Sequence, residues 1–177
     1  MILTIRVDEL LQLTLSRPSR DLVTRPTGAA IRGSIERAIA ATTCPTTLLD
    51  FEWVGLIDFS CADEVVAKLL RVVDAGVYIV LRGVDETQAE AIDDVLARQG
   101  LAVTALPRAG GLQMLGCTTP DLSLAFQMVH AAGSGDATRL ASRLGWSLER
   151  AADALQTLAM RRLILAAGGT FAPLPLQ

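Results

Sequence analysis

Residues 48–70 read L-L-D-F-E-W-V-G-L-I-D-F-S-C-A-D-E-V-V-A-K-L-L, and the rest of the first two thirds of the chain can be interpreted as support for this stretch. It begins with a short apolar run and ends with Val65, Val66, Leu69 and Leu70 spaced as on one face of a helix. An acidic loop with one serine joins the two parts. A strand that leads through a loop into a helix is typical of an α/β domain, where backbone N–H groups at the helix start favour an anion. We therefore expect the working surface of the chain at this loop.

The composition limits the class of protein. The chain has 177 residues, of which 51% are hydrophobic and 20% are charged, and its net charge is −3. No apolar run approaches the roughly 18 residues that a membrane span needs, and the first residues show no secretion signal. We therefore expect a cytoplasmic protein that does not enter a membrane. The acidic balance argues against a protein whose whole surface binds nucleic acid.

The few cysteines and the single histidine argue against a metal or disulfide protein. Cys44, Cys61 and Cys117 are odd in number and widely spaced, and His130 is the only histidine. The common enzyme motifs are also absent, so we expect no metal, no cofactor and no enzymatic activity. Cys61 keeps a third hypothesis open, because a thiol near a helix start can have a lowered pKa. An enzyme that uses Cys61 or the neighbouring acids would need a closed pocket beside the loop.

The first two thirds of the chain alternate between strand and helix patterns. The patterns predict strands at residues 2–7, 10–15, 46–51, 77–81 and 102–106, with residues 56–59 continuing the sheet edge. They predict helices at residues 27–41, 61–75 and 85–100, ended by Gly76 and Gly100 in the last two cases. Asp85 and Gln88 form a capping box. Residues 107–116 are either a short helix or the beginning of a linker. The alternation favours an α/β sheet with V-Y-I-V-L, residues 77–81, as its central strand.

After residue 116 the pattern changes to three short helices. Thr119 caps the first helix and Asp136 starts the second. A tight turn at residues 144–147 leads into the third, which is the helix-turn-helix arrangement. We therefore predict two domains, at residues 1–116 and 117–177.

The last residues predict a β-hairpin. Residues 163–167 and 170–174 are apolar and β-permissive, and Gly168-Gly169 between them suits a tight turn. A hairpin directly after a helix-turn-helix forms the wing of a winged helix. The second domain is therefore predicted to be a small α+β winged helix.

A set of residues in the first domain carries a family resemblance: Arg25, Leu49-Asp50-Phe51, Val54, Asp58, Phe59 and Ala62-Asp63-Glu64. With these residues, the chain from about residue 2 to 116 resembles the STAS superfamily, the fold of anti-sigma-factor antagonists. It looks most like the STAS-like family described as a domain of unknown function. The resemblance implies a mixed sheet with helices mainly on one face. It also implies a bacterial-type signalling protein that binds a protein partner, a kinase or an anti-sigma-type factor, without catalysis.

The resemblance also raises the question of a phosphoswitch. In the antagonists, a serine or threonine directly after the loop aspartate is phosphorylated by the partner kinase. Here Phe59 follows Asp58, and the hydroxyl arrives one position later at Ser60. Amides at the helix start would stabilise a phosphate on Ser60, whereas Asp58, Asp63 and Glu64 would repel it. Ser60 is therefore a candidate phosphosite, and a simple helix cap is the alternative.

The candidate partner-binding residues are Asp58, Phe59, Ser60, Asp63 and Glu64. Asp63 and Glu64 are not expected to form an acid/base pair, because adjacent helical residues point about 100° apart. As first-turn acids they complement the helix dipole instead.

The second domain leaves two functions open. Its third helix carries the candidate DNA-binding residues Arg150, Gln156, Arg161 and Arg162, but also Glu149 and Asp153, whereas a DNA reader is normally basic. Residues 121–177 hold five arginines and four acids, a net of +1. Our first hypothesis is a regulatory protein whose winged helix provides output or dimerisation, with a homodimer expected. The alternative is a transcriptional regulator that reads DNA.

Overall fold

The computed structural model describes residues 1–176 of the chain. Its internal contacts divide the chain into two compact units, Met1–Cys117 and Thr118–Gln177. Among the described residues, no helix combines the length and the apolar character that crossing a membrane requires.

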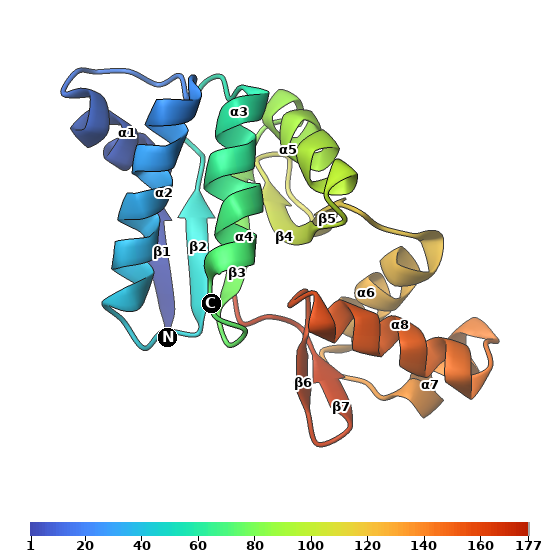
Figure 1. Cartoon of the computed structure of the whole chain (residues 1–177). Coiled ribbons are helices and arrows are strands. Elements are labelled where there is room, and N and C mark those ends of the chain that lie inside the picture. The colour runs from blue at the N-terminus through green and yellow to red at the C-terminus, as the bar shows by residue number, and fades with distance from the viewer. Residues whose placement is uncertain (177) are drawn as a thin grey trace. The chain divides into compact units, whose positions relative to one another are not determined.

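The first unit is built on a five-stranded mixed sheet (Figure 1). Its strands lie side by side in chain order: β1 (Ile2–Arg6), β2 (Thr46–Asp50), β3 (Tyr78–Val84), β4 (Ala102–Pro107) and β5 (Gln113–Gly116). Strands β1 to β4 are parallel, and β5 is antiparallel to β4. The V-Y-I-V-L segment supplies most of β3, so the prediction that it forms the central strand is confirmed.

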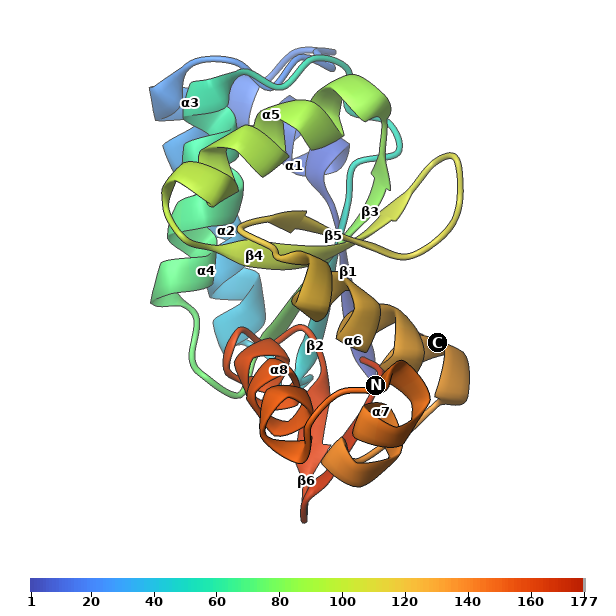
Figure 2. The same ribbon diagram turned by 90° about the vertical axis from the view of Figure 1, so that its right-hand side faces the viewer.

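Helices connect the parallel strands. These are α1 (Val7–Leu15), α2 (Arg25–Ala40), the helix after β2, which runs through α3 (Phe59–Ala62), η1 (Asp63–Lys68) and α4 (Leu69–Val72), and α5 (Glu86–Arg98). Each crossover leads to the next strand in the same direction, and right-handed crossovers then place α2, α3–α4 and α5 on one face (Figures 1 and 2). The core beneath them contains a row of residues in register across four strands: Ile5, Leu49, Leu81 and Ala105.

The segment at residues 10–15 is helical, so its prediction as a strand was wrong. Val7 and Leu11 lie one turn apart on α1 and are both fully buried. Asp8 and Glu9 stand in the first turn, where they complement the helix dipole. The short apolar run is compatible with either structure, and burial along one helix face decides for the helix.

Three other local predictions are corrected. Residues 113–116 form β5, and the turn before it uses Gly110 and Gly111 with positive φ, so this stretch is neither a helix nor a linker. Residues 56–59 do not continue the sheet, because Ile57 bridges only Leu22. The helix after β2 ends at Val72, before Gly76 is reached. The capping box at the start of α5 is confirmed.

The second unit contains three helices and a hairpin: α6 (Pro120–Ala132), α7 (Ala137–Leu144), α8 (Leu148–Met160), β6 (Leu165–Ala167) and β7 (Thr170–Ala172). The side chains of Thr119, Asp136 and Ser147 accept a backbone hydrogen bond at the start of the three helices in turn. These caps explain why the helices begin where they do.

Candidate functional site

The loop between β2 and α3 has a firmly held backbone. The side-chain amide of Gln88 donates to the carbonyls of Val54 (2.8 Å) and Gly55 (2.6 Å). On the other side, the N–H of Gly55 donates to the carbonyl of Arg20 (2.7 Å), and the N–H of Leu22 donates to the carbonyl of Leu56 (2.7 Å). Hydrogen bonds on both sides therefore fix the backbone of this loop, so its outward side chains keep a defined position.

Asp58 caps α3. One carboxylate oxygen accepts from the N–H of Cys61 (2.8 Å) and the hydroxyl of Ser60 (2.8 Å), and the other accepts from the N–H of Thr24 (3.0 Å). Burial would raise the pKa of Asp58, but these hydrogen bonds hold the pKa below its ordinary value. The alternative reading of Ser60 as the helix cap is thus corrected, since the cap is Asp58 and Ser60 is a half-buried donor to it.

Three large apolar side chains in this loop and at the start of α3 are exposed. Trp53, Leu56 and Phe59 expose 53%, 52% and 61% of their surface. The guanidinium of Arg20 lies 5.6 Å from the centre of the Trp53 ring. We call Trp53, Leu56 and Phe59 the apolar platform. Of these, sequence reasoning singled out only Phe59, although the large apolar residues of W-V-G-L in a loop were the available signal.

Glu64, in η1, is only 2% exposed. Its carboxylate forms ion pairs with Arg25 (2.8 Å), Arg32 (3.3 Å) and Lys68. Burial alone would raise the pKa of Glu64, but the hydrogen bonds from Lys68 and Arg25 keep the pKa below its ordinary value. Glu64 therefore joins α2 to η1 and offers almost no surface to a partner.

Asp63 is part of the same network. Its carboxylate accepts from Arg25 (2.7 Å) and from the side-chain amide of Gln99 (2.8 Å). Burial would raise the pKa of Asp63, but the hydrogen bonds from Arg25 and Gln99 hold this pKa below its ordinary value. Asp63 and Glu64 thus both pair with Arg25. These ion pairs account for the two acids without an appeal to the helix dipole.

Helix α2 crosses the helix after β2 at Gly28. A methyl group added at Gly28 would lie 3.0 Å from Cβ of Glu64 and 3.1 Å from Sγ of Cys61. The crossing coincides with the start of the π-helical segment η1, a distortion that is frequent at functional sites. Glycine is therefore needed here for the close approach of the two helices.

Cys61 is a structural residue in this arrangement. It is fully buried, and its thiol donates to the carbonyl of Thr24 (3.1 Å). Burial, reinforced by the negative charge of Asp58, raises the pKa of Cys61 to about 12. The expectation of a lowered pKa is therefore wrong, because desolvation outweighs the helix start.

The candidate DNA-binding residues of the second unit are scattered. Arg150 forms a two-point ion pair with Asp121 (2.6 and 2.7 Å) and stacks 4.3 Å from the centre of the Trp146 ring. Gln156 is exposed on α8, and Arg161 and Arg162 are half-buried just after its end. The structure therefore does not gather these residues into one basic surface.

Known proteins offer no match from which the role of this site could be assigned. No family model matches the chain. No curated protein and no solved structure matches it either.

Proposed function

We propose that this chain is a cytoplasmic, non-enzymatic regulatory protein of bacterial type. A STAS-like first unit binds a protein partner through the apolar platform and the start of α3. A winged-helix second unit provides output or dimerisation. The partner is a kinase or an anti-sigma-type factor.

The exposure of Phe59 carries this proposal. An aromatic ring exposed at the first turn of a helix loses apolar burial unless a partner covers it. Here it stands on a backbone fixed by Asp58 and by the loop contacts, so binding would cost little ordering entropy. Large apolar anchors on a rigid support are the usual centre of a protein interface. Phe59 thus takes the central place, and Trp53 and Leu56 extend the surface.

Ser60 is proposed as the regulatory element of this surface. Its hydroxyl binds Asp58, which also holds the first turn of α3. A phosphoryl group there would meet the carboxylate of Asp58 and disturb the turn that presents Phe59. Modification of Ser60 would therefore weaken partner binding.

The assignment of the second unit as a winged helix rests on its hairpin. Gly135, in the link between α6 and α7, exchanges two backbone hydrogen bonds with Phe171 of β7 (2.8 and 2.9 Å). This pairing ties the hairpin to the helices, as a wing requires. It supports a module with a hairpin wing beside a helix-turn-helix.

Co-purification of the intact protein with its native partners tests the proposal. We expect Phe59→Ala to lose the partner that the wild-type protein retains. Val72→Ala is the matched control, because Val72 is an exposed apolar residue (55%) at the far end of the same helix. A partner retained equally by both variants would contradict the proposal.

The alternative function is DNA binding through the second unit. The helix-turn-helix and the hairpin favour it, whereas exposed Glu149 and Asp153 on α8 would repel phosphate. A gel-shift assay at low salt with random-sequence duplexes separates the two functions. A shift that Arg161→Ala and Arg162→Ala abolish would favour the alternative, and no shift would exclude it.

A further inference from the structure

The first unit carries a groove between α5 and the loop that joins β4 to β5. Figure 2 shows this loop projecting from the sheet near the start of α5. The groove holds about 580 Å³, and its apolar lining comes from Val84, Ala89, Pro107 and Leu115. A volume of this size is typical of sites that enclose a ligand or several side chains.

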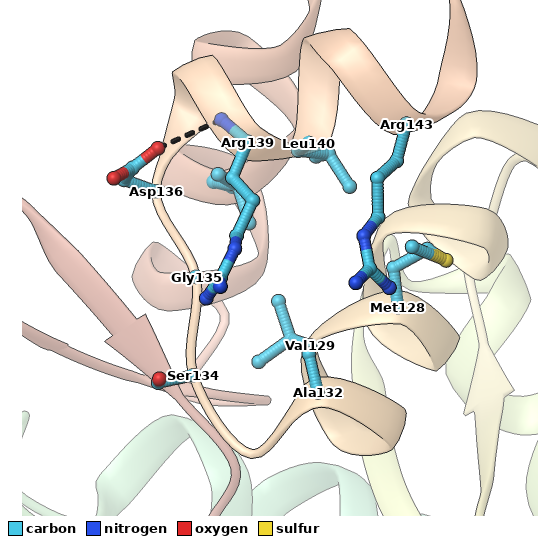
Figure 3. A pocket seen from close by; sticks show the side chains of 10 residues that line it. Met128, Val129, Ala132, Ser134, Gly135, Asp136, Arg139, Leu140 and Arg143 are labelled. Carbon is cyan, nitrogen blue, oxygen red and sulfur yellow. Dashed lines mark hydrogen bonds between the residues drawn. The ribbon is translucent and has the colours of Figure 1, made fainter.

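The hollow between α6 and α7 in the second unit offers no such room. Figure 3 shows Arg139 and Arg143 reaching from α7 toward Val129, one on each side of it. The hollow holds only about 20 Å³, which is little more than one water molecule needs. Of these two places, only the groove of the first unit can therefore take the side chains of a partner.

Three acids form a stripe along the α5 wall of the groove. Glu86, Glu90 and Asp93 stand at positions i, i+4 and i+7, so they lie on one face of the helix. All three are exposed, and within residues 1–176 none of them forms an ion pair. Asp93 accepts a hydrogen bond from the backbone N–H of Gly116 (2.7 Å), which leaves its charge unneutralised. The stripe is therefore free to meet cations.

Arg108 also lines the groove, but the backbone holds its guanidinium. It donates to the carbonyls of Gly83 (2.8 Å), Phe51 (3.1 Å) and Val54 (3.1 Å). An oxygen of Asp85 lies 3.8 Å from it. With four carboxylates and one guanidinium in its lining, the groove carries a net charge of −3 at neutral pH.

The contacts of Arg108 connect the groove to the apolar platform. Phe51 and Val54, whose carbonyls accept from Arg108, stand on either side of Trp53 in the sequence. Gln88 of α5 holds the carbonyl of Val54 as well. The groove and part of the platform are thus built on the same loop.

We infer that the groove takes an extended basic segment of the protein partner, with lysine or arginine at every second position. Glu86 and Glu90 are about 6 Å apart along α5, and alternate residues of an extended chain are about 6.6 Å apart. Each cation then faces one acid of the stripe, while its aliphatic stem covers the apolar lining. The inference rests on the proposed function and adds the chemistry of the partner.

The charge of the groove decides against other occupants. A nucleic acid would bring its phosphates against the three acids. An acidic or purely apolar segment would leave the acids unpaired. Exposed ion pairs are weak one by one and are screened by salt, so binding of a basic segment should weaken as the salt concentration rises.

Fluorescence anisotropy of a labelled R-V-R-V-R peptide, titrated with the full chain at low salt, tests the inference. This peptide should bind at least about threefold more tightly than R-R-R-V-V, which has the same composition without the alternation. E86Q/E90Q should weaken its binding at least about tenfold. The matched control is E149Q/D153N, which removes the same charge from exposed acids of α8. It should bind within about twofold of the wild type, because these acids lie in the other unit.

The native partner should follow the same order, binding E86Q/E90Q more weakly than E149Q/D153N. Circular dichroism confirms that both variants are folded. Equal loss of peptide binding in the two variants would show only general attraction between opposite charges, and equal affinity for the two peptides would exclude the alternation. Either result would overturn the inference, as would a partner that binds both variants equally.

Sedimentation equilibrium of the protein alone tests for a second copy in the groove. A mass that rises with concentration, and no longer does so in E86Q/E90Q and in R139Q/R143Q, would assign the groove to α7 of another chain and overturn the inference. The wild-type mass should instead not depend on Glu86 and Glu90.

The groove and the proposed function fail in different ways. If Phe59→Ala keeps the partner while E86Q/E90Q loses the peptide, the role of Phe59 fails and the chemistry of the groove stands. If Phe59→Ala loses the partner while E86Q/E90Q behaves like the wild type, only the inference on the groove fails.

Discussion

The carboxylate of Asp58 accepts a hydrogen bond of 2.8 Å from the hydroxyl of Ser60. The same oxygen also accepts from the N–H of Cys61, so the hydroxyl is a second donor on an existing helix cap. A change at Ser60 should therefore disturb the cap of α3 directly and, through this cap, the position of the exposed Phe59 ring.

Substitution of Ser60 should separate loss of this hydrogen bond from the effect of added charge. Ser60→Ala should lower the free energy of unfolding by about 0.5–1.5 kcal/mol. Ser60→Asp should lower it further, because the new carboxylate stands beside Asp58 and the repulsion outweighs the favourable helix dipole. Urea denaturation at neutral pH measures both. A Ser60→Asp protein as stable as Ser60→Ala would contradict this reading.

Gly28 should tolerate no side chain. Gly28→Ala places a methyl group against Glu64 and Cys61 and should lower the free energy of unfolding by about 1–3 kcal/mol. Gly33→Ala, on the same helix, is the control, because its methyl group would meet only the end of the Arg37 side chain at 3.5 Å. Gly33→Ala should raise the free energy of unfolding by about 0.4–1 kcal/mol. Urea denaturation measures both variants. A Gly28→Ala protein as stable as the wild type would show that the two helices do not cross so closely.

The ion pairs of Glu64 should appear in the pH dependence of stability. A carboxyl group whose pKa is lowered by folding stabilises the native state above its unfolded pKa, near 4.3 for glutamate. That contribution disappears as the pH falls through the folded pKa. Glu64→Gln should therefore be less stable than the wild type at pH 7, by about 1.5–3 kcal/mol, with a gap that shrinks below pH ~4.3.

The exposed Glu90, on α5, provides the control for this experiment. Glu90→Gln should differ little in stability from the wild type, as is usual for substitutions on the surface. A gap for Glu64→Gln that stays constant down to pH ~3 would show that the carboxylate is not stabilised by its ion pairs.

Cys61 should be inert in the native protein. With its pKa raised to about 12, it holds almost no thiolate at pH 8, and it is buried as well. Iodoacetamide should therefore modify it at least roughly a hundredfold more slowly in the native protein than in the urea-unfolded chain. Mass analysis of the peptide that contains Cys61 measures the rate. Equal rates in the two states would indicate an accessible thiol.

The sequence predicted the parallel core well but not its ends. The strand at residues 77–81 and the capping box of Asp85 rest on local patterns, which the sequence contains. The helix α1 was missed because a short apolar run such as L-L-Q-L-T-L fits both periods. The strand β5 was missed because Q-M-L-G has little strand character of its own and depends on pairing with β4.

The candidate site shows the same division between local and distant contacts. The sequence singled out the loop and the start of α3 because the strand-loop-helix pattern is local. The ion pair of Arg25 with Glu64 joins residues 39 positions apart, and no periodicity reports it. The approach of Gly28 to Cys61 likewise joins residues far apart in the sequence. Burial of Glu64 follows from these contacts and could not be predicted.

Calorimetric titration of the co-purified partner with the wild-type protein, Phe59→Ala and Val72→Ala measures whether Phe59 anchors the interface. We expect at least about tenfold weaker binding for Phe59→Ala, as for an interface anchor, and unchanged binding for Val72→Ala. A Phe59→Ala protein that binds as tightly as the wild type would contradict it.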